Sequence, residues 1–115
     1  KNIPAESPRL ASFNWLESEN KFELWFDYTF DGLKIRKGQL AKGFHLQGYL
    51  DQGTLETIIV PEKIEIRNNK IHLFYPEDFL PVKIKYAWAP APENNIMNSA
   101  GLPLAPFKIE LEGNN

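Results

Sequence analysis

The sequence predicts an all-β fold: a single-domain antiparallel β-sandwich of the jelly-roll or Greek-key kind. Large apolar residues alternate with polar ones in short runs, most clearly from Phe22 to Tyr28 and from Val82 to Trp88, which is the period of a strand with one buried face. Such runs recur roughly every eight to twelve residues with turn-forming residues between them. No stretch carries a helical period of useful length. At 115 residues the chain is long enough for one domain with its own core.

The N-terminal part offers two strands. The first is expected over residues 9–16, with Phe13 and Trp15 on its buried side. A polar turn follows, and the strongly alternating run 21–29 forms the second strand. Trp25 falls on the polar side of that alternation, where we expect a neighbouring loop or a partner domain to cover it, with a ligand platform as the alternative.

The middle of the chain predicts a strand, a β-branched strand and a hairpin. Residues 44–50 resume the alternation, residues 55–60 are β-branched, and residues 64–75 form a hairpin whose turn is Arg67-Asn68-Asn69-Lys70. Asparagine tolerates the positive φ that tight hairpins require. His45 and His72 lie on the polar phase of these strands, so both are expected to face solvent.

The C-terminal part predicts a crossing loop, two strands and a long connection. Residues 76–81 read as the loop, 82–88 as a strand and 107–111 as the last strand. Prolines at 90 and 92 end the strand at 82–88, because proline cannot donate to a ladder. The long segment that follows is of a kind that is often functional. The expected core includes six residues, Phe22, Phe26, Ile71, Leu73, Ile84 and Tyr86.

Composition and charge exclude several classes of function. The formal net charge is −2 with acids and bases interspersed, which gives no reason to expect nucleic acid or an anionic membrane as partner. The absence of cysteine removes disulfides and thiolate metal sites. No apolar run approaches the about 20 residues that span a bilayer. Residues 1–8, with two prolines, are expected to be an entry segment or linker before a sandwich over residues 9–115.

The sequence lacks the motifs of a catalytic centre. No serine lies in a Gly-x-Ser-x-Gly elbow, and two histidines without a His-x-x-x-His spacing make a zinc site unexpected. The acids are spread over turns and strands without a specific pair. We therefore expect no catalytic residue, no metal and no cofactor in this chain.

The C-terminal part contains the motifs Tyr86-Ala87-Trp88-Ala89, Pro92, Asn95, Asn98, Gly101-Leu102-Pro103 and Pro106-Phe107. In their residues and spacings these motifs resemble the closing segment of sialate O-acetylesterases, which are SGNH-type carbohydrate esterases. The resemblance covers most of the chain but only the C-terminal accessory β-domain of that family. A weaker match lies upstream at Gly32-Leu33 and at residues 40–44. The family's Asp-Asn pair is Pro90-Ala91 here, and its Tyr in Asn-Leu-Tyr-Asn is Met97.

The resemblance implies a non-catalytic domain that packs on an SGNH hydrolase domain, of the same or a partner polypeptide, which removes acetyl esters from sialic acid or other sugars. A periplasmic or secreted location would follow from it. The alternative is a free-standing carbohydrate-binding module that stacks sugars on Trp25, Trp88 or Tyr49. A basic cluster at Lys34, Arg36, Lys37 and Lys42 is expected to be a solvated loop face, with an acidic sugar as the alternative ligand. The candidate substrate-binding or interdomain residues are Trp88, Asn94, Asn95, Asn98, Gly101, Leu102, Pro103 and Phe107.

Overall fold

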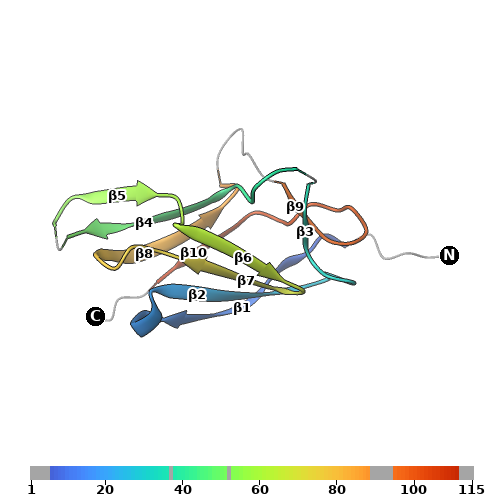
Figure 1. Cartoon of the computed structure of the whole chain (residues 1–115), viewed down its shortest axis with the longest axis horizontal. Coiled ribbons are helices and arrows are strands. Elements are labelled where there is room, and N and C mark those ends of the chain that lie inside the picture. Colours follow the sequence, from blue (N-terminus) through green and yellow to red (C-terminus); the bar gives the residue numbers. More distant parts are fainter. Residues whose placement is uncertain (1–5, 37, 52, 89–94, 112–115) are drawn as a thin grey trace.

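A computed structural model describes residues 6–36, 38–51, 53–88 and 95–111. Over these residues the fold is all-β, and every strand pair is antiparallel. Two four-stranded sheets face each other, and a two-stranded sheet closes one end (Figure 1). The prediction of an antiparallel sandwich is thus confirmed. The strands are β1 (Arg9–Leu16), β2 (Lys21–Asp27), β3 (Lys34–Ile35), β4 (Phe44–Leu50), β5 (Glu56–Ile59), β6 (Lys63–Arg67), β7 (Lys70–Phe74), β8 (Phe79–Tyr86), β9 (Ile96–Met97) and β10 (Phe107–Glu110).

The first sheet has the order β1-β2-β7-β6 and contains two hairpins. A short 3₁₀ turn, Glu17–Glu19, joins β1 to β2, and Asn20 closes it in the left-handed region with φ 53°. The predicted hairpin turn is confirmed: Arg67 pairs with Lys70, and Asn68 takes φ 54°. Asparagine occupies both positive-φ positions because its short polar side chain tolerates that conformation.

The second sheet has the order β10-β8-β4-β5, and its inner strand β8 corrects one prediction. Residues 79–81 were expected in a crossing loop, yet β8 begins at Phe79 and runs through Pro81. The register between β8 and β4 shifts next to Pro81 and leaves Val82 of β8 without a partner on β4. Such a bulge accommodates a residue that cannot donate to the ladder. Gly48 faces this point, and a Cβ there would lie 2.1 Å from the Leu80 carbonyl oxygen.

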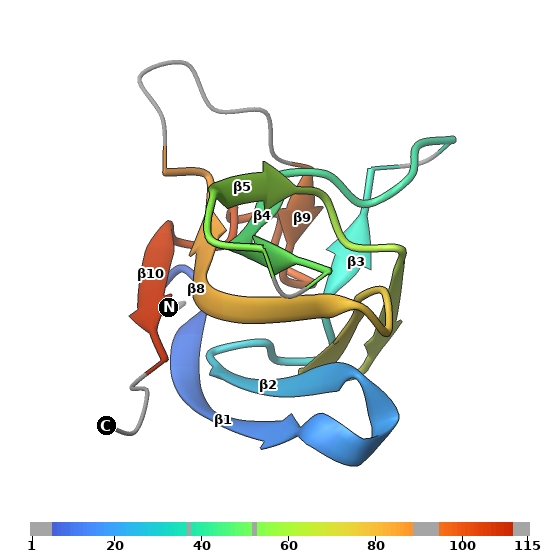
Figure 2. The same cartoon turned by 90° about the vertical axis from the view of Figure 1, so that its left-hand side faces the viewer.

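The two-stranded sheet pairs β3 with β9, far apart in sequence but adjacent in space (Figure 2). The sequence predicted a loop at both places. Each strand has only two residues, too few for an alternating pattern to appear. The pair ties the segment after β2 to the segment before β10.

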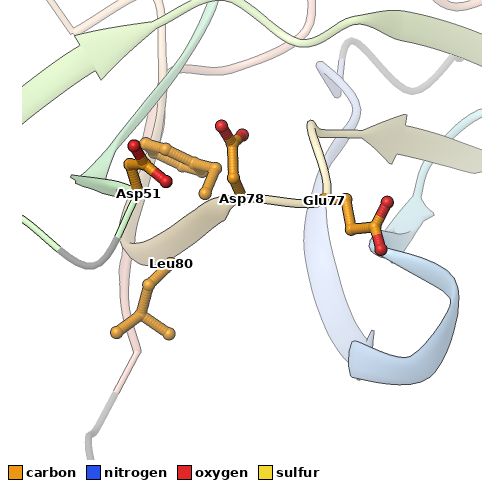
Figure 3. A pocket seen from close by; sticks show the side chains of 5 residues that line it. Asp51, Glu77, Asp78 and Leu80 are labelled. Carbon is orange, nitrogen blue, oxygen red and sulfur yellow. The ribbon is translucent and has the colours of Figure 1, made fainter.

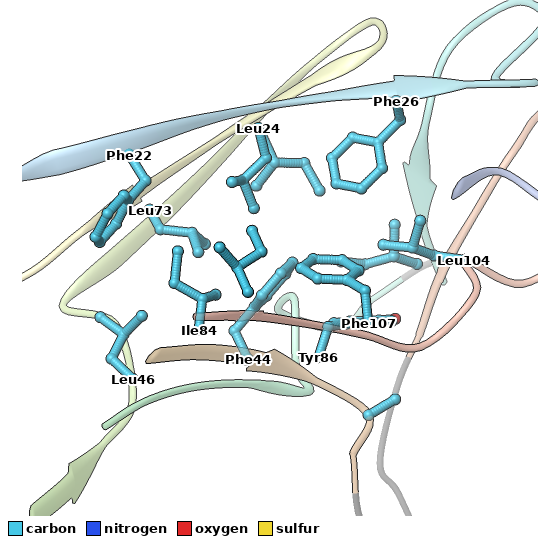
Figure 4. Packing of buried hydrophobic residues seen from close by; sticks show 14 of the residues in the cluster. Phe22, Leu24, Phe26, Phe44, Leu46, Leu73, Ile84, Tyr86, Leu104 and Phe107 are labelled. Carbon is cyan, nitrogen blue, oxygen red and sulfur yellow. The ribbon is translucent and has the colours of Figure 1, made fainter. Parts of the chain in front are cut away.

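The core lies between the two large sheets. Side chains from β2 and β7 meet those from β4, β8 and β10 (Figure 4). All six residues expected in the core are buried, each at most 3% exposed. Phe13 was expected on the buried side of β1, but it is 37% exposed, because β1 is the edge strand of its sheet. Trp15 is half-buried and donates from Nε1 to the Tyr75 hydroxyl at 2.8 Å.

The two histidines differ in exposure. His45 is exposed, as expected. His72 is only 9% exposed and corrects the prediction that it faces solvent. It lies on the outer face of a central strand, where Glu23 and Glu65 of the two neighbouring strands approach it at 3.4 and 3.9 Å. Side chains on a central strand are covered from both sides, so a polar phase does not guarantee exposure.

Candidate functional site

Asn95 anchors the start of the segment 95–107. Its side-chain oxygen accepts from the Lys42 backbone nitrogen at 3.0 Å, and its amide nitrogen donates to the Gln39 side-chain oxygen at 2.9 Å and to the Leu40 carbonyl at 2.7 Å. The side chain is 4% exposed. Its amide thus fixes the loop that precedes β4, the loop that carries the basic residues.

Asn98 fixes the middle of the same segment and is fully buried. Its amide nitrogen donates to the carbonyls of Glu6 and Tyr28, at 3.2 and 2.9 Å. Its side-chain oxygen accepts from the backbone nitrogens of Ala100 and Leu102, both at 3.0 Å. One amide therefore holds the N-terminal segment, the end of β2 and the following turn together, and all its hydrogen-bonding capacity is used within the chain.

The remaining candidate residues of this segment divide between surface and core. Gly101 is exposed with φ 85°, and Leu102 is half-buried. Pro103 is exposed and forms an isolated bridge with Met97. Phe107 is buried and stacks on Tyr86, with ring centroids 5.6 Å apart. The expected role of Asn94 falls on a residue outside the described ranges.

Trp88 corrects a prediction about orientation. The alternation placed it on the buried face with Tyr86, but it is 52% exposed. Ala87 takes φ 54° and is buried, so the backbone turns there and sends Trp88 to the outer face of the second sheet. Nζ of Lys108 lies 5.5 Å from the centre of its ring, within cation–π range.

A pocket of about 300 Å³ opens beside Trp88 on this outer face. No sequence pattern predicted this pocket, although its β4 and β8 residues belong to the polar phases of two predicted strands. Trp88 and the β5 residue form its apolar walls, and the others provide its polar groups. We call it the Trp88 pocket; its lining residues are His45, Gln47, Ile58, Lys85 and Trp88.

A second pocket, of about 330 Å³, lies at the far end of β4. Asp51, Glu77, Asp78, Phe79 and Leu80 line it. The carboxylates of Asp51 and Asp78 lie near each other, whereas Glu77 points away (Figure 3). In the part of the chain that the structure describes, no three His, Cys, Asp or Glu side chains are grouped to hold a metal ion.

The described residues contain no serine–histidine pair. Ser99 accepts a hydrogen bond from the Asp31 backbone nitrogen at 3.1 Å, and His72 is flanked by carboxylates. Burial and the nearby charge of Lys21 lower the pKa of His72, and Glu23 and Glu65 offset part of this effect. His72 therefore lies between two acids, and among the described residues no serine hydroxyl forms a hydrogen bond with it.

The other aromatic and basic candidates lie apart from the Trp88 pocket. Trp25 is half-buried on the outer face of the first sheet, where Nζ of Lys70 lies 4.6 Å from its ring centre. Tyr49 is half-buried on β4. Lys34, Arg36 and Lys42 are exposed, and Lys37 is outside the described ranges.

Fold and site together define a compact antiparallel β-sandwich that carries an aromatic pocket on an outer sheet face. Among solved structures, the chain is similar to a carbohydrate acetylesterase from Xanthomonas citri, with 22% identity and a TM-score of 0.75. The match covers 96% of this chain but 24% of the other, so the chain spans about a quarter of that protein's length. This likeness shows the fold. No protein-family model matches the chain, and a search of curated proteins finds no match. No helix among the described residues is long and apolar enough to cross a membrane.

Proposed function

We propose that this chain is the non-catalytic β-sandwich domain of a carbohydrate acetylesterase of the sialate O-acetylesterase-like, SGNH type. It packs on a hydrolase domain that removes acetyl groups from sugars. The observation that supports the proposal most is the match of nearly the whole chain to about a quarter of a carbohydrate acetylesterase. A domain-sized match of this kind is what an accessory unit of a larger enzyme would give.

The residues of the chain agree with a supporting role. An ester hydrolase built on serine needs a nucleophile, a base and a carboxylate in contact, and the described residues hold no such set. By contrast, the segment 95–107 is fixed in place at Asn95 and Asn98. Holding a loop costs about 1–2 kcal/mol per residue of backbone entropy, so this much anchoring suits a surface that must keep its shape against a partner.

The residues that touch the partner would be the exposed ones and not the anchors. The side chains of Asn95 and Asn98 form their hydrogen bonds within the chain. By contrast, Gly101 and Pro103 are exposed and Leu102 is half-buried, so the turn presents apolar surface to the outside. We therefore assign the interdomain contact to the turn 101–103, which the two asparagines position.

The second candidate function is a free-standing carbohydrate-binding module, and the Trp88 pocket is the observation that favours it.

The test uses the complete reading frame that contains residues 1–115. An upstream SGNH domain in that polypeptide supports the accessory role, and a lone or tandem β-domain supports the binding module. In the complete protein, Leu102→Ser is expected to lower kcat/KM for an acetylated sugar about tenfold, with little change in Tm. The matched control is Leu55→Ser, since Leu55 is 83% exposed in a different loop. Equal kcat/KM in both variants would reduce the turn to a structural element.

A further inference from the structure

The Trp88 pocket lies on the open outer face of the sheet β10-β8-β4-β5. The strand register places Lys85 between His45 on one side and Lys108 on the other. One step along the same face, Lys83 pairs with Gln47, which in turn pairs with Ile58. Two lysines and a histidine, Lys108, Lys85 and His45, therefore form a row across three strands, and Lys85 and His45 of this row line the pocket. The nearest acid on β10 is Glu110, which lies opposite Lys83.

This row is costly to the free protein. Lysines directly opposite each other on adjacent strands repel, and Lys85 and Lys108 are such a pair. Glu110 relieves Lys108 at 3.5 Å, but no ion pair within the described ranges reaches Lys83 or Lys85. An anion bound between these side chains would turn the repulsion into attraction.

The apolar walls carry a second cost. Trp88 is 52% exposed and Ile58 is 59% exposed, and both line the pocket. An indole face is an efficient surface for stacking a ring, and exposing it to water gains nothing for the fold. Between these walls, the amide of Gln47 can both donate and accept hydrogen bonds, as ring hydroxyls require.

We propose that the Trp88 pocket binds an acidic saccharide, a sugar ring that carries a carboxylate. The ring stacks on Trp88 and contacts Ile58, its hydroxyls bond to Gln47 and His45, and its carboxylate lies between Lys85 and Lys108. The pocket, at about 300 Å³, is at the lower end of small-molecule sites, which suits one or two sugar rings. An acidic peptide would satisfy the lysines but not use the hydroxyl partners and the stacking face together.

This site does not depend on the proposed accessory role, because it is complete within the chain. Its test measures binding and not hydrolysis, so either proposal can fail without the other. The isotopically labelled chain is titrated with sodium D-glucuronate and followed by amide and indole NMR shifts. D-glucose, sodium acetate and a poly-glutamate peptide are titrated under the same pH and ionic strength.

Glucuronate is expected to shift the Trp88 indole and the backbone signals around His45 and Lys85, with saturation. Glucose and acetate should bind at least about tenfold more weakly, since glucose lacks the carboxylate and acetate lacks the sugar ring. Trp88→Ala and Lys85→Gln should each weaken glucuronate about tenfold. The matched controls are Phe30→Ala, with Phe30 46% exposed, and Lys63→Gln, with Lys63 paired to Glu65; both should leave Kd unchanged.

Four results would overturn the proposal: no saturable shift with glucuronate, equal affinity for glucose, equal affinity for acetate, or an unchanged Kd in Lys85→Gln. Saturable binding of poly-glutamate without glucuronate would make the site a peptide-binding surface and overturn it as well. Circular dichroism of each variant shows that the fold is retained. Lys85→Arg provides a further check, because it keeps the charge and should keep binding within about threefold.

Discussion

Asn98 offers a quantitative test of how the segment 95–107 is held. Its amide makes four hydrogen bonds within the chain while fully buried. A net contribution of about 1 kcal/mol per bond gives an upper sum of about 4 kcal/mol. Ala100 and Tyr28 are exposed residues, so water replaces part of the loss. We therefore expect Asn98→Ala to lower the free energy of unfolding by about 2–4 kcal/mol.

Asn98→Asp sharpens this prediction, since it keeps the shape and changes only the chemistry. It replaces the donating nitrogen by an oxygen that faces the carbonyls of Glu6 and Tyr28. A buried, unpaired carboxylate costs about 3–5 kcal/mol, so at neutral pH this variant should be less stable than Asn98→Ala. Protonation restores one donor. The introduced carboxyl has a raised pKa in the folded state, so its penalty shrinks as pH falls from neutral toward about 4.

Urea unfolding followed by tryptophan fluorescence measures both variants. Asn14→Ala is the matched control, because Asn14 is exposed on the edge strand β1, and it should stay within about 0.5 kcal/mol of the parent. A loss below about 1 kcal/mol for Asn98→Ala would refute the reasoning. The reasoning would also be refuted if the Asn98→Asp variant were more stable than Asn98→Ala at neutral pH.

Two further predictions concern the sheets. Gly48→Ala should lower the free energy of unfolding by about 3 kcal/mol or more, because its Cβ would meet the Leu80 carbonyl oxygen at 2.1 Å. The control is Gly53→Ala, whose nearest contact is at 3.1 Å and which should cost under about 1 kcal/mol in the same urea assay. Equal losses in the two variants would contradict the bulge argument. Burial lowers the pKa of His72 from its ordinary 6.5, so the folded state binds fewer protons than the unfolded state and stability falls as pH drops below that value. His72→Gln should flatten this slope between about pH 7.5 and 5; an unchanged slope would show that His72 does not cause it.

The strands that the sequence predicted are those with local signals. β1 and β4 begin and end at the expected residues, and the β6–β7 hairpin has the expected turn. In each case, alternation and turn chemistry lie within a few consecutive residues. The six predicted core residues follow from the same alternation, because one phase of each strand faces the opposite sheet.

The features that the sequence missed depend on pairing between distant residues. Pro81 is accommodated in β8 by a bulge, where the register between β8 and β4 shifts opposite Gly48. β3 and β9 are strands only because they pair with each other. Trp88 lies on the opposite face from the predicted one because Ala87 has a positive φ. The Trp88 pocket joins three strands, so it exists only once their order and register are set.

The most direct test of the proposed accessory role is a hydrolysis assay on residues 1–115 alone. The substrates are a chromogenic acetyl ester and an O-acetylated sialic acid, with the complete polypeptide as the positive control. We expect no turnover above the buffer rate by the isolated chain, because its serines and histidines form no catalytic pair in the described residues. Turnover that survives purification and is abolished by a single Ser or His substitution, such as His72→Gln, would contradict the account.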